Sequence, residues 1–183
     1  MRVITGTAKG VNLKTLTGIN TRPTSAQVKE AIFSFLQFEL EGAVVLDLFA
    51  GSGQLGIEAL SRGAALAHFV ERSPEAIAVI RENLAKTRLS EKAMIYRVPR
   101  NAGFRIPNSE MDIAFLDPPY HQGILPKVLP ALAGKMKQGG VIVCEHEKEE
   151  CLPNEVDAFK MDKTYHYGTI AVTVYRGGSL GNE

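Results

Sequence analysis

The feature that most constrains the fold is the alternation of short apolar runs with helical segments between residues 43 and 145. Buried strands are predicted for five apolar runs, at residues 43–49, 66–71, 93–98, 111–116 and 141–145. Helices are predicted between them for residues 53–62, 74–89 and 124–137. Strands that alternate with helices predict an α/β protein with a doubly wound, Rossmann-like and mostly parallel sheet.

Both ends of the chain depart from this alternation. Residues 3–5 and 11–13 flank a turn-prone stretch from Gly6 to Gly10, which predicts a small N-terminal β-hairpin. Two strand-like runs, 158–163 and 169–175, predict an antiparallel pair at the C-terminal edge of the sheet. Thr24, with a glutamine three residues later, predicts the start of a helix by a capping box. We therefore divide the chain into a hairpin extension, residues 1–22, and a main domain, residues 23–183.

Length and charge narrow the classes of protein that fit. The 183 residues, 45% of them apolar, are enough for one sizeable core and few for two full domains. The net charge is only +1, yet the first 29 residues contain no acid and five basic side chains: Arg2, Lys9, Lys14, Arg22 and Lys29. This segment either faces phosphates or is a solvated surface charged by chance.

Cysteine and histidine usage predicts no metal. Two cysteines and four histidines show no ligand spacing, and a reduced, cytoplasmic chain is the simplest expectation. No apolar run approaches the roughly 20 residues of a membrane helix, so no membrane association is expected.

The first predicted turn carries a candidate cofactor loop. Asp47-Leu48-Phe49-Ala50-Gly51-Ser52-Gly53 follows a strand and opens a helix. Glycines let the backbone turn sharply, and the helix N-terminus offers free N–H groups to a negative group. Glu71 ends the next strand, where its carboxylate can accept hydrogen bonds from a ribose diol.

The same spacing, Gly51-x-Gly53-x-x-Gly56 followed by Glu71, also fits a nicotinamide dinucleotide site, and a simple packing turn is a third alternative. Asp47 argues against a dinucleotide because an acid on the strand repels pyrophosphate but can pair with an amino-acid ammonium. The chain also has no room for a separate dehydrogenase substrate domain.

A second loop indicates the reaction. Asp117-Pro118-Pro119-Tyr120 follows a buried strand and therefore lies at the carboxyl end of the sheet, where ligands bind in open α/β folds. Hydrogen bonds from an amine to Asp117 and to the Pro118 carbonyl would pull its nitrogen toward tetrahedral geometry and align it with a methyl donor. Tyr120 offers a flat face on which a base can stack. The alternative is an ordinary proline turn capped by Asp117.

These motifs resemble those of class I S-adenosylmethionine-dependent methyltransferases that modify exocyclic amines. Within that class the chain is similar to the RsmD family of small-subunit (16S) ribosomal-RNA guanine-N2 methyltransferases. The residues shared with that family are Met1-Arg2-Val3-Ile4-Thr5-Gly6, Arg22-Pro23-Thr24, Glu58-Ala59-Leu60-Ser61-Arg62-Gly63-Ala64 and Tyr167-Gly168-Thr169. The resemblance covers nearly the whole chain and implies a methyltransferase-type sheet.

The resemblance also implies which residues act. The cofactor would be S-adenosylmethionine, with its ribose on Glu71 and its methionine part on Asp47 and the glycine loop. Family members often carry an acid after the third strand to bind the adenine amine; Asn101 at that place could accept through its amide oxygen. The predicted cofactor site comprises Asp47, Phe49, Ala50, Gly51, Ser52, Gly53, Glu71, Arg72, Asn101 and Ala102. The predicted catalytic residues are Asp117, Pro118 and Tyr120, and the predicted RNA contacts are Arg2, Lys9, Lys14, Arg22 and Thr24.

The implied function is methylation of a guanine N2 in small-subunit ribosomal RNA, presented on a ribosomal particle, without a metal or a covalent enzyme intermediate. A DNA adenine-N6 methyltransferase shares the acceptor motif but usually carries a target-recognition domain, for which this chain has little room. A glutamine methyltransferase typically has Asn where this chain has Asp117. A non-catalytic RNA-binding protein of the same fold would not need both loops intact.

The end of the fifth predicted strand carries several acids. Glu145 and His146 either line the cleft or lie at a solvated strand end, and the second alternative is favoured. The acidic run from Glu145 to Glu150 is likewise expected to face solvent.

Overall fold

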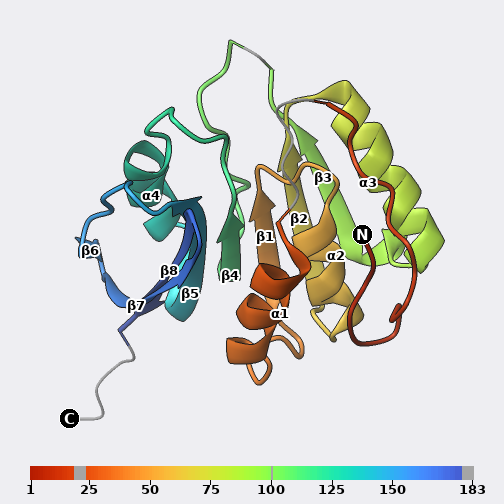
Figure 1. Ribbon diagram of the computed structural model, residues 1–183, viewed down its shortest axis with the longest axis horizontal. Coiled ribbons are helices and arrows are strands. Elements are labelled where there is room, and N and C mark those ends of the chain that lie inside the picture. The colour runs from red at the N-terminus through yellow and green to blue at the C-terminus, as the bar shows by residue number, and fades with distance from the viewer. Residues whose placement is uncertain (19–23, 100, 179–183) are drawn as a thin grey trace.

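The computed structural model describes residues 1–18, 24–99 and 101–178, and in these ranges one sheet has the strand order β3-β2-β1-β4-β5-β8-β7-β6 (Figure 1). The strands are β1 (Val44–Leu48), β2 (Leu66–Glu71), β3 (Ala93–Arg97), β4 (Met111–Leu116), β5 (Met136–Glu147), β6 (Glu155–Val156), β7 (Phe159–Tyr167) and β8 (Ile170–Gly177). The helices are α1 (Ala26–Phe35), α2 (Gln54–Ser61), α3 (Pro74–Thr87) and α4 (Leu125–Ala133), with a 3-10 turn at Ser90–Lys92.

The sheet is doubly wound, as the sequence predicts. Strands β1 to β5 pair in parallel, and β8 and β7 add to β5 as an antiparallel pair. From β1 the chain moves outward to β2 and β3, then returns to the other side of β1 with β4 and β5. The loops after β1 and β4 therefore diverge, which leaves a crevice at the carboxyl ends of these strands.

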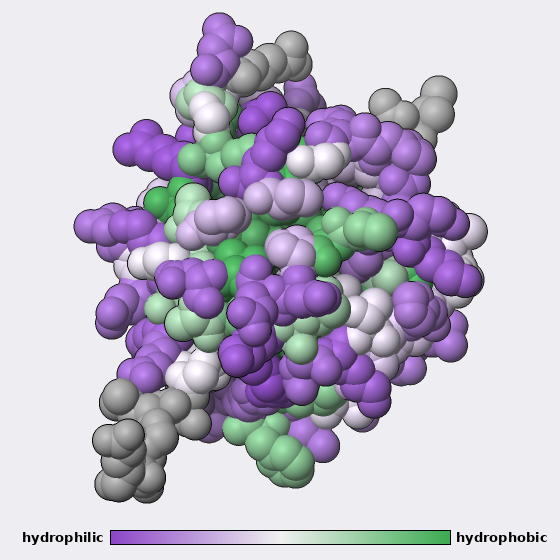
Figure 2. All heavy atoms as spheres, turned by 90° about the vertical axis from the view of Figure 1, so that its left-hand side faces the viewer, coloured by the Kyte–Doolittle hydropathy of each residue, from purple (hydrophilic) through white to green (hydrophobic). Residues whose placement is uncertain are grey.

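Two apolar clusters fill the space on the two faces of the sheet. Alternate strand residues such as Val45 and Phe115 pack against α1, α2 and α3, while Leu46 and Leu116 pack against α4. Figure 1 shows α4 on one side of the sheet and the other helices on the opposite side. From the side of α4 and β6, hydrophilic side chains cover most of the surface and hydrophobic ones gather near its centre (Figure 2). Successive strand residues point to opposite faces of the sheet. This alternation determines which strand side chains face α1 and can reach the crevice.

The start of α1 differs from the prediction. The N-cap is Ser25, whose hydroxyl oxygen accepts the backbone N–H of Val28, so the capping box at Thr24 is wrong. Thr24 is buried and its hydroxyl is used elsewhere, as described below. Helix α3 begins at Pro74, as predicted, and Ser73 is its N-cap.

The region after α4 also differs. The predicted helix to residue 137 ends at Ala133, and Met136 already pairs with Met111 in the sheet. Strand β5 is therefore longer than the predicted 141–145, with an irregularity of register opposite Met111 and Ile113. Propensity alone does not detect this segment because its strand pairing depends on a distant partner.

The N-terminal segment turns back on itself and lies on α2, but in place of the two strands of the predicted hairpin it has a single antiparallel bridge between Arg2 and Asn12. Glu58 accepts the backbone N–H groups of Ile4 and Thr5 at 2.9 and 3.0 Å. Ser61 adds three hydrogen bonds to residues 5–8. The stretch from Glu58 therefore forms the surface that holds the chain's first residues.

One of the five N-terminal cations cannot face phosphates. Lys29 is 1% exposed and pairs with Glu58 at 3.0 Å, and Arg62 pairs with the other oxygen of Glu58 at 2.9 Å. The prediction of a surface charge is therefore wrong for Lys29. None of the helices in the described ranges is both long and apolar enough to span a bilayer.

Candidate active site

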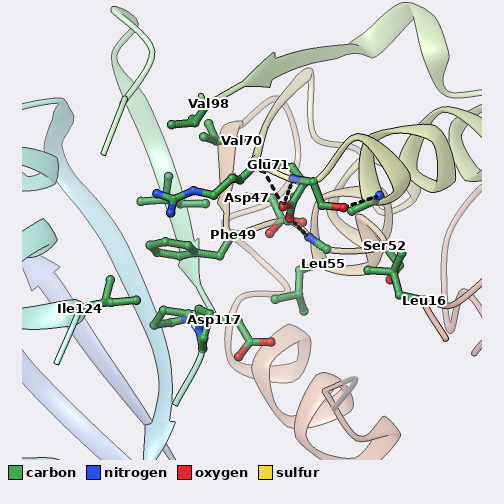
Figure 3. A pocket seen from close by; sticks show the side chains of 18 of the residues that line it. Leu16, Asp47, Phe49, Ser52, Leu55, Val70, Glu71, Val98, Asp117 and Ile124 are labelled. Carbon is green, nitrogen blue, oxygen red and sulfur yellow. Dashed lines mark hydrogen bonds between the residues drawn. The ribbon is translucent and has the colours of Figure 1, made fainter. Parts of the chain in front are cut away.

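A cavity of about 810 Å³ opens at the divergence of the loops after β1 and β4. Figure 3 shows Asp47, Phe49 and Asp117 along this cavity, with Ser52 and Leu16 toward one end. The predicted residues that line it are Thr24, Asp47, Phe49, Ala50, Gly51, Ser52, Glu71, Arg72, Asp117, Pro118 and Tyr120. Two loops that are about 65 positions apart in sequence thus share one cavity.

The cofactor loop has the strained backbone that its sequence suggests. Gly53, the N-cap of α2, adopts a left-handed conformation with φ of 78°, which glycine accepts without steric cost. Gly56 lies so close to the ring of Phe69 that an added Cβ would approach it to 2.4 Å. Phe49 has a positive φ of 70° although it is not a glycine, and such strain occurs mainly at functional sites. Its ring packs edge-on against Phe104 at the cavity wall.

Glu71 fastens the cofactor loop to β2. Its Oε2 accepts the backbone N–H of Gly51 at 2.8 Å, and its Oε1 accepts those of Arg72 and Ser73. A carboxylate offers about four lone-pair positions, so capacity remains on the side that lines the cavity. Glu71 therefore positions the loop and can also receive a ligand hydroxyl.

Asp47 is a buried acid at the end of β1. It is 2% exposed, and its Oδ2 accepts the backbone N–H of Gly56 in the first turn of α2 at 2.9 Å. Burial raises the pKa of Asp47 to about 7; the hydrogen bond from Gly56 opposes this rise and the negative charge of Glu71 adds to it. A cationic ligand group, such as the ammonium expected from the sequence, would compensate this carboxylate.

Asp117 of the acceptor loop is held by the segment that precedes α1. The hydroxyl of Thr24 donates to its Oδ2 at 3.1 Å. Burial and the negative charge of Glu145 raise the pKa of Asp117 well above its usual value; the Thr24 hydrogen bond lowers it and Asp47 raises it further. Thr24, predicted to contact RNA, is therefore placed against the predicted catalytic acid.

Glu145 lies in an environment that the sequence did not predict. It is 3% exposed, and His146 is 4% exposed, so the predicted solvated strand end is wrong for both. The hydroxyl of Tyr120 donates to Oε1 of Glu145 at 3.3 Å. His146 points to the opposite face, where its ring hydrogen-bonds with Thr173. The expectation that the acids face solvent holds for Glu149 but not for Glu145.

Several predicted residues lie outside the cavity wall. Asn101 is exposed and Ala102 packs against the α4-side cluster, and neither lines the cavity, although Val98 and Phe104 on either side do. Gly53 lies beneath the loop. Arg2 and Lys9 are exposed on the N-terminal segment, exposed Lys14 forms an ion pair with Glu82 at 2.8 Å, and Arg22 lies outside the described residues.

The cavity also contains residues that no motif indicated. Gln54 is 6% exposed, lines the cavity, and its Oε1 has no hydrogen-bond partner within the described part of the chain. Arg105 and Lys127 add positive charge to the wall, and Leu16 adds an apolar side chain from the N-terminal segment. In the described ranges, no group of three His, Cys, Asp or Glu side chains is arranged to hold a metal ion.

Comparison with known proteins identifies a family and its relatives. The model of the family described as "Conserved hypothetical protein 95" matches residues 1–176. The chain is 39% identical over 188 residues to "Putative rRNA methyltransferase YlbH" of Bacillus subtilis, covering 96% of this chain and 98% of that protein. It is 30% identical over 185 residues to "Ribosomal RNA small subunit methyltransferase D" of Escherichia coli, covering 100% of this chain and 93% of that protein.

Solved structures show the same architecture. "Putative methyltransferase yhhF" from Escherichia coli matches with a TM-score of 0.84 at 28% identity, covering 98% of this chain and 99% of that one. An RNA methyltransferase from Salinibacter ruber in complex with S-adenosyl-L-homocysteine matches with a TM-score of 0.63 at 17% identity, covering 88% of this chain and 98% of that one. The fold is therefore that of the Rossmann-like methyltransferases.

Proposed function

This chain belongs to the RsmD family, whose model carries the description conserved hypothetical protein 95, and on that premise we propose that it methylates small-subunit ribosomal RNA. The methyl donor is S-adenosylmethionine and the acceptor is the exocyclic N2 amine of a guanine. Relatives that are named as ribosomal-RNA methyltransferases and that match nearly end to end support the substrate class.

The observation that carries the proposal is the presence of Asp47 and Asp117 in one cavity. Asp47 belongs to the glycine loop that suits an amino-acid cofactor, and Asp117 belongs to the loop that suits an amine acceptor. A nicotinamide site would not need the second loop, and a simple proline turn would not need to face a cofactor pocket.

The residues present fit S-adenosylmethionine. Asp47 is a buried carboxylate that a ligand ammonium would compensate, and Gln54 lines the same cavity with a side-chain oxygen that has no hydrogen-bond partner among the described residues. Glu71, which lines the cavity, would accept hydrogen bonds from the ribose hydroxyls. The ligand of the Salinibacter ruber enzyme, S-adenosyl-L-homocysteine, is the product form of this cofactor and supports the choice. When bound, S-adenosylmethionine supplies an electrophilic methyl group on a sulfonium sulfur.

The acceptor loop performs the remaining chemistry. Asp117 accepts a hydrogen bond from the target amine, which turns the nitrogen lone pair out of the ring and toward the methyl group. When the nitrogen takes the methyl group it must release one proton, and the Asp117 carboxylate receives it. Tyr120 provides a flat surface for the base.

Replacing Asp117 tests this assignment. We expect Asp117→Ala to keep its cofactor affinity and to lose on the order of a hundredfold or more in methyl transfer, measured by calorimetry and by label transfer to ribosomal RNA. Glu110→Ala, at an exposed acid outside the cavity wall, is the control. Full turnover in Asp117→Ala would show that Asp117 has only a structural role in the turn.

The product identifies the acceptor atom. Mass spectrometry of nucleosides should show N2-methylguanosine in small-subunit RNA, present with the gene and absent without it. N6-methyladenine in DNA would instead support the DNA methyltransferase alternative, and RNA binding without any methyl transfer would support the non-catalytic one.

A further inference from the structure

Glu145 stands beside the acceptor loop although no motif includes it. Leu116 of β4 pairs with Cys144 of β5 in parallel, so Asp117, just after the end of β4, and Glu145, within β5, lie at the same level of the sheet. Neighbouring strands lie about 4.7–4.9 Å apart and side chains alternate between faces. The two carboxyl groups therefore point to the same face, below the start of α1.

One hydrogen bond and one electrostatic effect connect Glu145 to the loop. The hydroxyl of Tyr120 donates to Glu145 Oε1 at 3.3 Å. The negative charge of Glu145 also acts on Asp117 and favours its protonated form. Because Glu145 is 3% exposed, water screens this charge weakly.

We propose that Glu145 is a positioning residue of the methyl-transfer site, which holds the Tyr120 ring in place for the target base and sets the charge of Asp117. The inference rests on the proposed function and deepens it. It assigns the end of β5 a role beside the two loops that the motifs identify.

The position of Glu145 explains how the site can both bind an amine and take its proton. Asp117 must be ionised to accept the amine hydrogen bonds, and it receives one proton as the nitrogen is methylated. A second carboxylate alongside makes the ionised form costly, so Asp117 accepts that proton readily. Tyr120 meanwhile cannot rotate away from the base without losing its hydrogen bond to Glu145.

The groups that face Asp117 come from three elements. Glu145 lies on β5, Asp47 on β1, and the hydroxyl of Thr24 lies ahead of α1. Arg72, Arg105 and Lys127 are the basic side chains in the described lining of the same cavity. After burial, the negative charge of Glu145 has the largest effect on the pKa of Asp117.

The sharpest test separates charge from hydrogen bonding. Glu145→Gln keeps an oxygen that can accept from Tyr120 but removes the charge, so the pKa of Asp117 falls. Activity requires ionised Asp117, so the acidic limb of the kcat/KM profile should move to lower pH by at least about one unit. KM for ribosomal RNA should change little. Glu149→Gln, at an exposed acid four residues further on, is the matched control and should leave the limb in place.

Tyr120→Phe removes the hydrogen bond to Glu145 and leaves the charge. The charge of Glu145 remains, so the acidic limb should stay in place. Loss of the hydroxyl frees the ring, and KM for ribosomal RNA should rise roughly three- to tenfold. Glu145→Leu should combine both effects, and adding Tyr120→Phe to it should raise KM no further.

A titration of Asp117, which needs no enzymatic turnover, distinguishes the role proposed for Glu145 from the proposed function of the protein. The carbon-13 shift of the Asp117 carboxyl, assigned by its loss in Asp117→Asn, should report a lower pKa in Glu145→Gln than in the wild type. An unchanged pKa in that variant overturns the role of Glu145 even if the enzyme is active. If the pKa of Asp117 is lower in Glu145→Gln but the wild type transfers no methyl group to ribosomal RNA, the proposed function is wrong, whereas the electrostatic coupling between Glu145 and Asp117 is confirmed.

Discussion

Asp47 carries a carboxylate at a strand position that is otherwise suited to an apolar side chain. Its neighbours Leu46 and Leu48 are fully buried, and burial raises the pKa of Asp47 to about 7. An ionised acid at this position carries a desolvation cost, which a cationic ligand group would offset. Residues of this kind, with a shifted pKa in a cavity, are candidates for function.

The first prediction concerns cofactor affinity and pH. Below about pH 7 Asp47 is protonated, and it must lose its proton to pair with an ammonium. Affinity for S-adenosylmethionine should therefore rise with pH, by up to about tenfold per unit, and level off above pH 7. Calorimetry in buffers of different ionisation enthalpy should detect proton release on binding. An affinity independent of pH would show that Asp47 does not meet the ammonium.

A second prediction follows for the stability of the ligand-free protein. The folded-state pKa of Asp47 is raised above its unfolded value near 3.8, so the folded state binds more protons between these values. Its contribution is favourable at low pH and is lost as pH rises through about 7. Asp47→Asn should therefore raise Tm at pH 8 by several degrees, whereas at pH 4 the difference should be small. Thermal melting followed by circular dichroism at both pH values decides this.

Glu71 yields the third prediction. Glu71→Ala removes an acceptor for the ribose hydroxyls and the hydrogen bond that holds Gly51, so affinity for S-adenosylmethionine should fall at least about tenfold. The matched control is Glu75→Ala, an acid in the first turn of α3 that also lines the cavity. A similar loss in both variants would show that general charge, and not the ribose contact, determines affinity.

At the scale of elements, α2 connects the cofactor loop with the N-terminal segment. Its first turn receives Asp47, and its last turn holds residues 4–8 through Glu58 and Ser61. Lys29 of α1 is buried against the same Glu58. Three elements therefore meet on one ion cluster, and the N-terminal segment cannot separate from the helix without exposing a buried charge.

The fourth prediction concerns this cluster. Lys29→Met leaves Glu58 buried with one cation fewer and should lower the free energy of unfolding by about 3 kcal/mol. Adding Glu58→Gln should restore part of the loss, because the remaining group is then neutral. Urea denaturation measures both, with the exposed pair Lys86 and Glu82 as a control whose loss should change the free energy of unfolding much less than the loss of Lys29. Additive losses in the double variant would refute the pairing.

At the scale of the whole molecule, charge is nearly balanced at +1, so attraction to RNA must come from local groups. The N-terminal segment is a candidate, with Arg2 and Lys9 exposed and Lys14 partly engaged by Glu82. Because Val3, Ala8 and Leu13 are part of the main core, this segment is fixed relative to the cavity. We propose that it contacts the RNA around the target guanine.

The fifth prediction tests that contact. Changing Lys9, Lys14 and Arg22 together to Gln should weaken RNA binding and flatten its dependence on salt by up to about three in log–log slope. Cofactor affinity should remain nearly the same. A control variant with Lys92, Lys135 and Lys160 changed to Gln removes equal charge elsewhere. If both variants weaken binding equally, net charge rather than this segment is what RNA recognises.

The sequence by itself determined the order of elements and the two loops. The ends of β2 and β4 match the predicted residues, because most side chains of a buried parallel strand are apolar. The glycine loop and the acceptor loop were placed at the carboxyl edge because a doubly wound sheet puts every such loop there. Local pattern and chain direction suffice for these statements.

Only the tertiary structure decided what surrounds the acids. Glu145 is buried because β4 and β5 pair in a particular register beneath α1, and Thr24 reaches Asp117 although 93 positions separate them. Lys29 is one of the five basic residues in the first 29 positions, yet it is buried and pairs with Glu58. Burial and charge pairing depend on contacts between distant segments, and a single sequence records which residues are present but not which of them meet.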